Sequence, residues 1–174
     1  MALTRYTRLG EIVTDSEPRH VPDLNIDALW TLLGEEHNGV LATIKRSGRP
    51  QLSNISYHYD PEHRIARMVA ASFRAKAQNL QRDPRASLHV SNHGFTLWVV
   101  AEGLVEISEP AQSVDDAVGR EILAMGQGER ADMTDAERAE HIKRYPVIDR
   151  QIIRLHIERI YGGNASKSLG VSSA

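Results

Sequence analysis

A strand–turn–strand pattern occupies the residues Gly39-Val-Leu-Ala-Thr-Ile-Lys-Arg-Ser-Gly-Arg-Pro-Gln-Leu-Ser-Asn-Ile-Ser-Tyr-His-Tyr59. Residues 40–45 predict a short strand, Ser47-Gly48 predicts a tight turn, and residues 51–59 predict the returning strand of a β-hairpin. The returning strand has no cleanly apolar face, which is unusual for a strand with one buried side. Either an edge position or a face turned toward a ligand accounts for this polarity.

The rest of the chain continues the strand pattern and inserts helices between strands. Further strands are predicted at 64–71, 86–91, 95–107 and 151–161, and the run 95–107 is apolar enough for burial on both faces. Helices are predicted from Asp23 to the stop at Asn38-Gly39, from Ser72 to Asp83-Pro84, and after the capping pairs Ser113/Asp116 and Thr134/Glu137. Hairpin-linked strands need no helical crossovers, so the sequence predicts a mainly β fold with helices, as an antiparallel barrel or sandwich of about six strands.

The composition is that of an ordinary globular protein, with 41% hydrophobic and 25% charged residues in a chain of 174. We expect one domain over residues 23–162, an N-terminal arm over 1–22 and a C-terminal tail over 163–174. The net charge of −2 argues against a nucleic-acid-binding protein. No apolar run reaches membrane-spanning length, so we expect a cytoplasmic protein without a membrane partner.

The residue types also limit the chemistry of any site. The chain has no cysteine, which excludes disulfides, thiolate metal sites and a cysteine nucleophile. His89 and His93 are four residues apart, but a predicted turn separates them and no third ligand is near, so no metal site is expected. No nucleotide-binding glycine motif or hydrolase motif is present.

Arg74 and Lys76 fall in the first turns of a predicted helix that Ser72 could cap. The amino end of a helix already carries partial positive charge and favours anions, so two cations there suggest an anion to be held. Free N–H groups at a helix start also bind phosphate. Two solvated surface cations are the alternative interpretation.

The hairpin and three later stretches together resemble the split β-barrel flavin and deazaflavin oxidoreductases, a family often called pyridoxamine-phosphate-oxidase-like. The later stretches are Ser72-Phe-Arg-Ala-Lys-Ala-Gln-Asn-Leu-Gln-Arg-Asp-Pro-Arg-Ala86, Val100-Ala-Glu-Gly103 and Arg159-Ile-Tyr-Gly162. The resemblance spans residues 26–162, in the family's order and spacing. It implies a six-stranded antiparallel split β-barrel (an FMN-binding split barrel) that forms a homodimer with cofactor sites at the interface.

The pattern is similar to the actinobacterial branch of the family, which binds the deazaflavin coenzyme F420 in place of FMN. Gly39-Val-Leu-Ala-Thr43 and Arg74-Ala-Lys76, followed by Asn79-Leu-x-x-Asp-Pro-Arg85, are typical of that branch. FMN-using relatives more often place the two cations side by side, whereas Ala75 separates them here.

The resemblance also implies which residues contact the cofactor: Gln51, Ser53, Asn54, Ser72, Arg74, Lys76, Asn79 and Trp98. Arg74 and Lys76 would hold the phosphate, as a fork and a point charge, and Ser72 would add a hydroxyl and a free N–H. The three residues of the second strand would contact the flavin ring or ribityl chain, and Asn79 would face the same cleft. Trp98 would lie near the ring bound by the partner subunit; a core or interface position accounts for it equally well.

The expected function is that of an oxidoreductase that uses reduced coenzyme F420 to deliver a hydride to an electron-poor small molecule, such as an enone, a quinone or a tetrapyrrole. The cofactor carries the difficult chemistry in such enzymes, which agrees with the absence of an evident catalytic triad. A proton could come from solvent, Tyr57 or His58. The alternatives are an FMN-binding flavoprotein and a non-catalytic cofactor-binding protein on the same fold.

Overall fold

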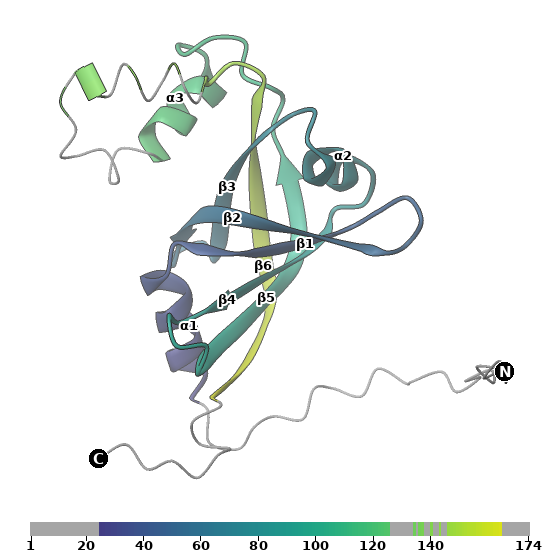
Figure 1. Cartoon of the computed structure of the whole chain (residues 1–174), viewed down its shortest axis with the longest axis vertical. Coiled ribbons are helices and arrows are strands. Elements are labelled where there is room, and N and C mark those ends of the chain that lie inside the picture. The colour runs from purple at the N-terminus through teal and green to yellow at the C-terminus, as the bar shows by residue number, and fades with distance from the viewer. Residues whose placement is uncertain are drawn as a thin grey trace, which may run out of the picture.

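The computed structural model describes residues 25–125 and 146–164, together with residues 134, 136, 137, 140 and 143. Six strands form a closed antiparallel barrel in the order β1-β2-β3-β6-β5-β4 (Figure 1). The strands are β1 (Asn38–Ile44), β2 (Pro50–Asp60), β3 (Ile65–Ala71), β4 (Arg85–Ser91), β5 (Leu97–Ile107) and β6 (Arg150–Asn164). The helices are α1 (Ile26–Glu35), α2 (Ala75–Arg82) and α3 (Ala117–Met125). The predicted mainly β fold and six-stranded antiparallel barrel are confirmed.

The ends of the domain differ in detail from the sequence predictions. The arm at 1–22, Asp23 and the tail beyond residue 164 lie outside the described residues, and β6 continues to Asn164. The N-cap of α1 is Asn25, whose side chain accepts a hydrogen bond from Asp27 N at 3.0 Å, and the helix begins at Ile26. No helix in the described part of the chain is long and apolar enough to span a bilayer.

Local turn and capping signals are confirmed elsewhere. Gly48 has a φ of 79° and its N–H donates to Lys45 O at 2.9 Å, which closes the β1–β2 hairpin. The predicted capping box is present, since Thr134 N donates to Glu137 Oε2 at 2.8 Å and Glu137 N donates to Thr134 Oγ1 at 3.3 Å. Short-range sequence signals therefore locate these two features correctly.

The prediction that the fifth strand is buried on both faces is wrong. Val99, Ala101 and Val105 of β5 point into the barrel and are buried, whereas Leu104 on the other face is 45% exposed. A barrel strand contributes only its inward face to the core, so the outward apolar residues of β5 remain accessible in this chain.

The inward side chains of all six strands meet in one apolar core, which the helices complete. Helix α1 packs Leu29, Leu32 and Leu33 against one end of the barrel, and α2 contributes Leu80 at the other (Figure 1). Each such buried side chain stabilises the fold by about 1.5–3 kcal/mol. Tyr57 belongs to this core and donates its hydroxyl to Leu33 O at 2.8 Å, which ties β2 to α1.

A β-bulge interrupts the ladder between β5 and β6. Glu102 lies opposite Arg159 and Gly103 lies opposite Ile157, so Glu158 is the extra residue. The backbones approach so closely there that a Cβ on residue 103 would lie 1.8 Å from His156 O. Only glycine fits this position.

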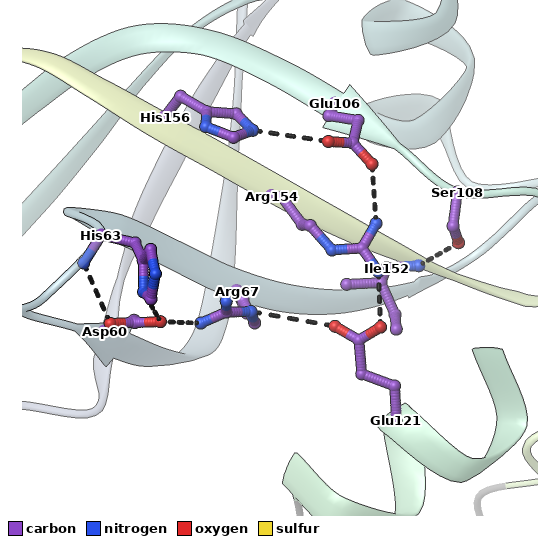
Figure 2. A network of polar contacts seen from close by, with 9 residues as sticks. All are labelled: Asp60, His63, Arg67, Glu106, Ser108, Glu121, Ile152, Arg154 and His156. Carbon is purple, nitrogen blue, oxygen red and sulfur yellow. Dashed lines mark hydrogen bonds and ion pairs between the residues drawn. The ribbon is translucent and has the colours of Figure 1, made fainter. Parts of the chain in front are cut away.

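Helix α3 is attached to the outside of the barrel by a network of charges (Figure 2). Arg67 on β3 and Arg154 on β6 are direct neighbours across the sheet, an arrangement that is unfavourable without counter-charges. Glu121 of α3 supplies one, at 3.8 Å from Arg67 Nε and 2.5 Å from Arg154 Nη2. Asp60 accepts from Arg67 Nη1 at 2.9 Å, and Glu106 accepts from Arg154 Nη1 at 3.1 Å.

The replacement Gly103→Ala is expected to lower the free energy of unfolding by at least about 1–3 kcal/mol, because the new methyl group would collide with the backbone of His156. The matched control is Gly34→Ala in α1, where a Cβ would meet only Tyr59 Cδ1 at 3.8 Å. That change should raise stability by about 0.5–1 kcal/mol through helix propensity. Urea unfolding measures both; equal effects of the two substitutions would contradict the bulge argument.

The contribution of Asp60 to stability should depend on pH. Hydrogen bonds from Arg67 and His63 lower the pKa of Asp60 to about 2. Because the folded-state pKa lies below the unfolded-state value, the stabilisation is present above about pH 4 and is lost as the pH falls toward 2. The stability difference between the wild-type protein and Asp60→Asn should therefore shrink over this range. A constant difference between pH 5 and pH 2 would show that the charge of Asp60 does not contribute.

Candidate functional site

The amino end of α2, the start of β2, the end of β3 and the segment before β6 enclose a cleft of about 810 Å³. This volume is in the range of small-molecule sites. The lining residues are Gln51, Leu52, Ser53, Val69, Ala70, Ala71, Phe73, Arg74, Ala75, Lys76, Pro146, Ile148, Asp149 and Arg150. Four of the residues predicted from the sequence therefore lie together in one cleft: Gln51, Ser53, Arg74 and Lys76.

The amino end of α2 opens onto this cleft without a side-chain cap. Arg74 occupies the N-cap position and its side chain makes no capping hydrogen bond, so the helix begins at Ala75. The prediction that Ser72 caps the helix is wrong. Arg74 N donates to Ala71 O at 3.0 Å, so the chain completes a turn after Ser72 before the helix starts. Ser72 itself donates its N–H to Asp149 O at 2.8 Å and is not among the lining residues.

Two cations lie beside the first N–H groups of α2, which have no partner within the helix. Lys76 Nζ donates to Asn54 O at 3.4 Å. Its pKa lies below the usual lysine value because the side chain is half-buried and lies close to Arg74. Within the described residues neither cation has a carboxylate partner. The helix dipole, the N–H groups at the start of α2 and the two cations together make a site for an anion.

The walls of the cleft also include three large, exposed apolar side chains. Leu52 is 67% exposed, Phe73 is 71% exposed and Ile148 is 52% exposed, although each is a large hydrophobic side chain. The Arg74 guanidinium lies 5.3 Å from the Phe73 ring centroid, so apolar and cationic groups are in direct contact. Exposed apolar groups gathered around a cleft indicate a ligand surface. The arrangement suits a ligand with both an apolar, planar part and an anionic part.

The three predicted residues of β2 point in two directions, as strand alternation requires. Gln51 and Ser53 are half-buried, whereas the Asn54 side chain is exposed on the opposite face. Asn54 reaches the site through its backbone oxygen, which accepts from Lys76. Gln51 lies between the cleft and the interior, because its Nε2 donates to Ser53 Oγ at 2.7 Å and its Oε1 accepts from Thr43 Oγ1 at 3.1 Å.

Asn79 lies beneath the cleft and does not line it. It is 7% exposed, and its Nδ2 donates to Thr43 Oγ1 at 3.1 Å and to Gln51 Oε1 at 3.4 Å. Arg82 Nη2 donates to Asn79 Oδ1 at 3.1 Å and to Ile44 O at 2.7 Å. These bonds fix α2 to the β1–β2 hairpin, so Asn79 positions the helix that carries Lys76.

Trp98 lies far from this cleft in the same chain. It pairs with Gly163 near the end of β6, whereas Arg150 at the start of β6 lines the cleft. Its ring stacks on His89 with centroids 6.1 Å apart and meets Tyr161 edge-on at 6.4 Å. The structure thus places Trp98 on an aromatic surface of β4, β5 and β6.

The fold and the cleft agree with a comparison of the sequence with protein families. The profile of the pyridoxamine 5'-phosphate oxidase family matches residues 26–162. The chain belongs to this family. The match begins at the first residue of α1 and ends within β6, so it covers the whole barrel and the cleft.

One related protein and two solved structures differ in how much of this chain they match. The F420H2-dependent biliverdin reductase of Mycobacterium tuberculosis is 30% identical over 94 residues, which are 54% of this chain and 66%, just under two thirds, of that protein. The conserved hypothetical protein Rv2991 from Mycobacterium tuberculosis has a TM-score of 0.67 at 22% identity, with 90% of this chain and 96% of that chain covered. An F420 reductase has a TM-score of 0.58 at 22% identity, with 75% and 94% covered. At these identities the two structures show a shared fold.

Sequence reasoning missed the segment before β6. Ile148 and Asp149 line the cleft, and Asp149 has a φ of 63°, a left-handed conformation that aspartate tolerates better than most residues. Arg150 also lines the cleft and donates from Nε to Pro146 O at 2.7 Å. No local signal marks these residues, because they reach the cleft only through the pairing of β6 with β3.

The two side chains considered as proton donors are also placed by the structure. Tyr57 is 1% exposed, and burial raises its pKa above the usual tyrosine value. Its hydroxyl donates to Leu33 O, so of the possible proton sources Tyr57 is the one enclosed in the core. His58 is half-buried on β2, has its ring 6.4 Å from that of His37, and is not among the lining residues of the cleft.

The replacement Lys76→Met is expected to raise the Tm of the ligand-free protein by about 1–2 °C, because it removes a partly desolvated charge next to Arg74. The gain should shrink as the pH rises toward about 10.4, the usual lysine pKa, because the pKa of Lys76 in the folded protein lies below that value. Inorganic phosphate should raise the Tm of the wild-type protein more than that of the variant.

The matched control is Lys45→Met, which removes an exposed lysine outside the cleft. Thermal unfolding with and without phosphate tests the three proteins. A phosphate response that is the same in all of them would contradict an anion site at Lys76.

Proposed function

We propose that the protein is an oxidoreductase that uses reduced deazaflavin coenzyme F420 to deliver a hydride to an electron-poor small molecule. The observation that carries the proposal is the cleft in which the uncapped amino end of α2, Arg74 and Lys76 meet the exposed apolar side chains of Leu52, Phe73 and Ile148. The family assignment supports a flavin-type cofactor, and the partial match to an F420H2-dependent reductase supports the deazaflavin.

The residues present fit such a cofactor. Arg74 offers a planar fork of donors and Lys76 a point charge, which together with the N–H groups of α2 suit a phosphate. Carboxylates of an oligoglutamate tail would also be attracted to these cations. Leu52, Phe73 and Ile148 would cover the faces of the ring system, and Ser53 offers a hydroxyl beside them.

When bound, reduced coenzyme F420 supplies a hydride. The protein's part is to bind, orient and shield. The apolar side chains around the cleft would exclude water from the ring, and the cations would fix its orientation by holding the anionic end. A proton that accompanies the hydride would come from solvent, since Tyr57 is enclosed in the core.

The substrate class is an enone, a quinone or a tetrapyrrole. The name of the Mycobacterium tuberculosis relative supports the last of these, because biliverdin is an open-chain tetrapyrrole. Such substrates are conjugated and electron-poor, so they accept a hydride at carbon. The apolar rim of the cleft suits a flat conjugated molecule stacked on the cofactor.

A homodimer with cofactor sites at the interface is part of the proposal. The outward face of β1, β4, β5 and β6 carries Trp98, Tyr161 and the exposed Leu104, and it holds a second hollow of about 400 Å³. A partner packed on this face would cover its apolar groups. Sedimentation should give twice the monomer mass, and Leu104→Arg should shift it toward the monomer.

The main alternative is an FMN-binding flavoprotein, which the family assignment also supports. Titration of the purified protein with coenzyme F420 and with FMN, followed by fluorescence, distinguishes the two. We expect tight binding of coenzyme F420 and weak binding of FMN. Tight FMN binding without coenzyme F420 binding would overturn the choice of cofactor.

Lys76→Met should weaken coenzyme F420 binding about 10- to 100-fold, as expected for loss of a charge-assisted contact. Lys45→Met should bind like the wild-type protein. Oxidation of reduced coenzyme F420 by menadione, a cyclic enone or biliverdin then tests turnover. Tight binding without turnover of any of the three would favour a non-catalytic cofactor-binding protein.

A further inference from the structure

A chain of hydrogen bonds connects Arg82, at the end of α2, to Ser53 in the cleft. Arg82 Nη2 donates to Asn79 Oδ1 at 3.1 Å, and Asn79 Nδ2 donates to Gln51 Oε1 at 3.4 Å. Gln51 Nε2 then donates to Ser53 Oγ at 2.7 Å. Thr43 joins from the side, since its hydroxyl accepts from Asn79 Nδ2 and donates to Gln51 Oε1, both at 3.1 Å.

The direction of donation along this chain is fixed at both ends. A guanidinium can only donate, so the Asn79 amide must turn its oxygen to Arg82 and its nitrogen to Gln51. At the other end, Gln51 Nε2 also donates to Leu52 O at 3.1 Å, and a carbonyl can only accept. Reversing either amide would bring two donors or two acceptors face to face, which buried polar groups avoid.

Ser53 is therefore an acceptor toward Gln51, and its own O–H is left to donate elsewhere. A hydroxyl has a single hydrogen to donate. Among the described residues no group accepts the hydrogen of Ser53, and Ser53 lines the cleft. This hydrogen is therefore available to a molecule in the cleft.

We infer that Ser53 is a hydrogen-bond donor to the ligand, held in that role by Gln51 and Asn79, and that the ligand atom it meets is an acceptor. This inference rests on the proposed cofactor function. Flavins and deazaflavins carry such acceptors as ring carbonyl oxygens and as phosphate oxygens. Gln51 and Asn79 are positioning residues, because they act on the ligand only through Ser53 and α2.

Three substitutions separate this role from a merely structural one. Ser53→Ala removes the donor. Asn79→Asp places acceptors toward both Arg82 and Gln51. This favours a reversed Gln51 amide, which gives up its bond to Leu52 O and accepts from Ser53 at Oε1. Ser56→Ala is the matched control, since it removes a hydroxyl of the same strand that donates to Asn38 Oδ1 and lies outside the cleft.

The dissociation constant is measured with coenzyme F420 and with FMN. Ser53→Ala should weaken binding about three- to tenfold, the effect of one neutral hydrogen bond. Asn79→Asp should weaken it at least as much, and adding Ser53→Ala to Asn79→Asp should have no further effect. Both Asn79→Asp and the double variant carry the new carboxylate, so its effect on binding cancels when these two proteins are compared. Ser56→Ala should leave the dissociation constant unchanged, because its hydroxyl is not part of the chain that reaches Ser53.

The outcomes separate failure of this inference from failure of the proposed function. A wild-type protein that binds neither cofactor rejects the proposed function. If the wild-type protein binds and Ser53→Ala binds equally well, the role of Ser53 is overturned. The same follows if Ser53→Ala weakens binding by the same factor in the wild-type protein and in Asn79→Asp. Two smaller ligands identify the acceptor. If Ser53 donates to the ring, Ser53→Ala should weaken binding of phosphate-free 8-hydroxy-5-deazariboflavin. If Ser53 donates to the phosphate, Ser53→Ala should weaken binding of inorganic phosphate.

Neutron diffraction from crystals of the deuterated wild-type protein tests the direction without a ligand or a variant. Deuterium on Gln51 Nε2 facing Ser53, with the Ser53 deuterium facing the cleft, supports the inference even if Asn79→Asp does not fold. A Ser53 deuterium directed at Gln51 overturns it.

Discussion

The pairing of β6 with both β3 and β5 is the constraint on which the rest of the structure depends. Residues 150–156 of β6 pair with β3, and residues 153–164 pair with β5 apart from the bulge at Glu158, so the last strand closes the barrel. The segment just before β6 carries Ile148 and Asp149, and the end of β3 leads into Arg74 and Lys76. Closure of the barrel therefore also brings the segment before β6 to the cationic part of the cleft.

The cleft has the character of a binding site because its groups are poorly satisfied without a ligand. Half-burial next to Arg74 disfavours the charged form of Lys76, and Leu52, Phe73 and Ile148 expose large apolar surfaces to water. Beneath them the bonds among Thr43, Gln51, Asn79 and Arg82 hold the surface in place. A ligand with an anionic end and a flat apolar body would pair with the charge of Lys76 and cover the exposed apolar side chains.

The sequence predicted those features that local signals encode. Ser47-Gly48 located the hairpin, and Asp83-Pro84 marked the end of α2. The unusual placement of Arg74 and Lys76 identified the cationic part of the cleft. Their meaning depended on the neighbouring polar strand and on the family resemblance, since the two charges alone are equally consistent with a solvated surface.

Features that depend on distant contacts could not be predicted. Ile148 and Asp149 carry no local mark of a site. Asn79 has the residue type of a ligand contact, but its register on α2 turns it to buried partners on β1 and β2. Ser72 has the residue type of a cap, but the turn at 71–74 delays the helix. Trp98 is separated from the cleft by the length of β6, which only the strand register reveals.

The bulge at Glu158 divides β6 into two parts with different surroundings. Residues 153–156 have a strand on each side, whereas residues 159–164 pair in the described ladder with β5 alone. An open strand edge is a template for pairing with other chains. Helix α1 lies against this part of the strand, with Leu29 Cδ2 so close to Gly162 that a Cβ there would come within 2.5 Å of it. Helix α1 therefore shields this strand edge from pairing with other chains, as well as contributing to the core. A chain that began after α1 would expose the unpaired edge to such pairing.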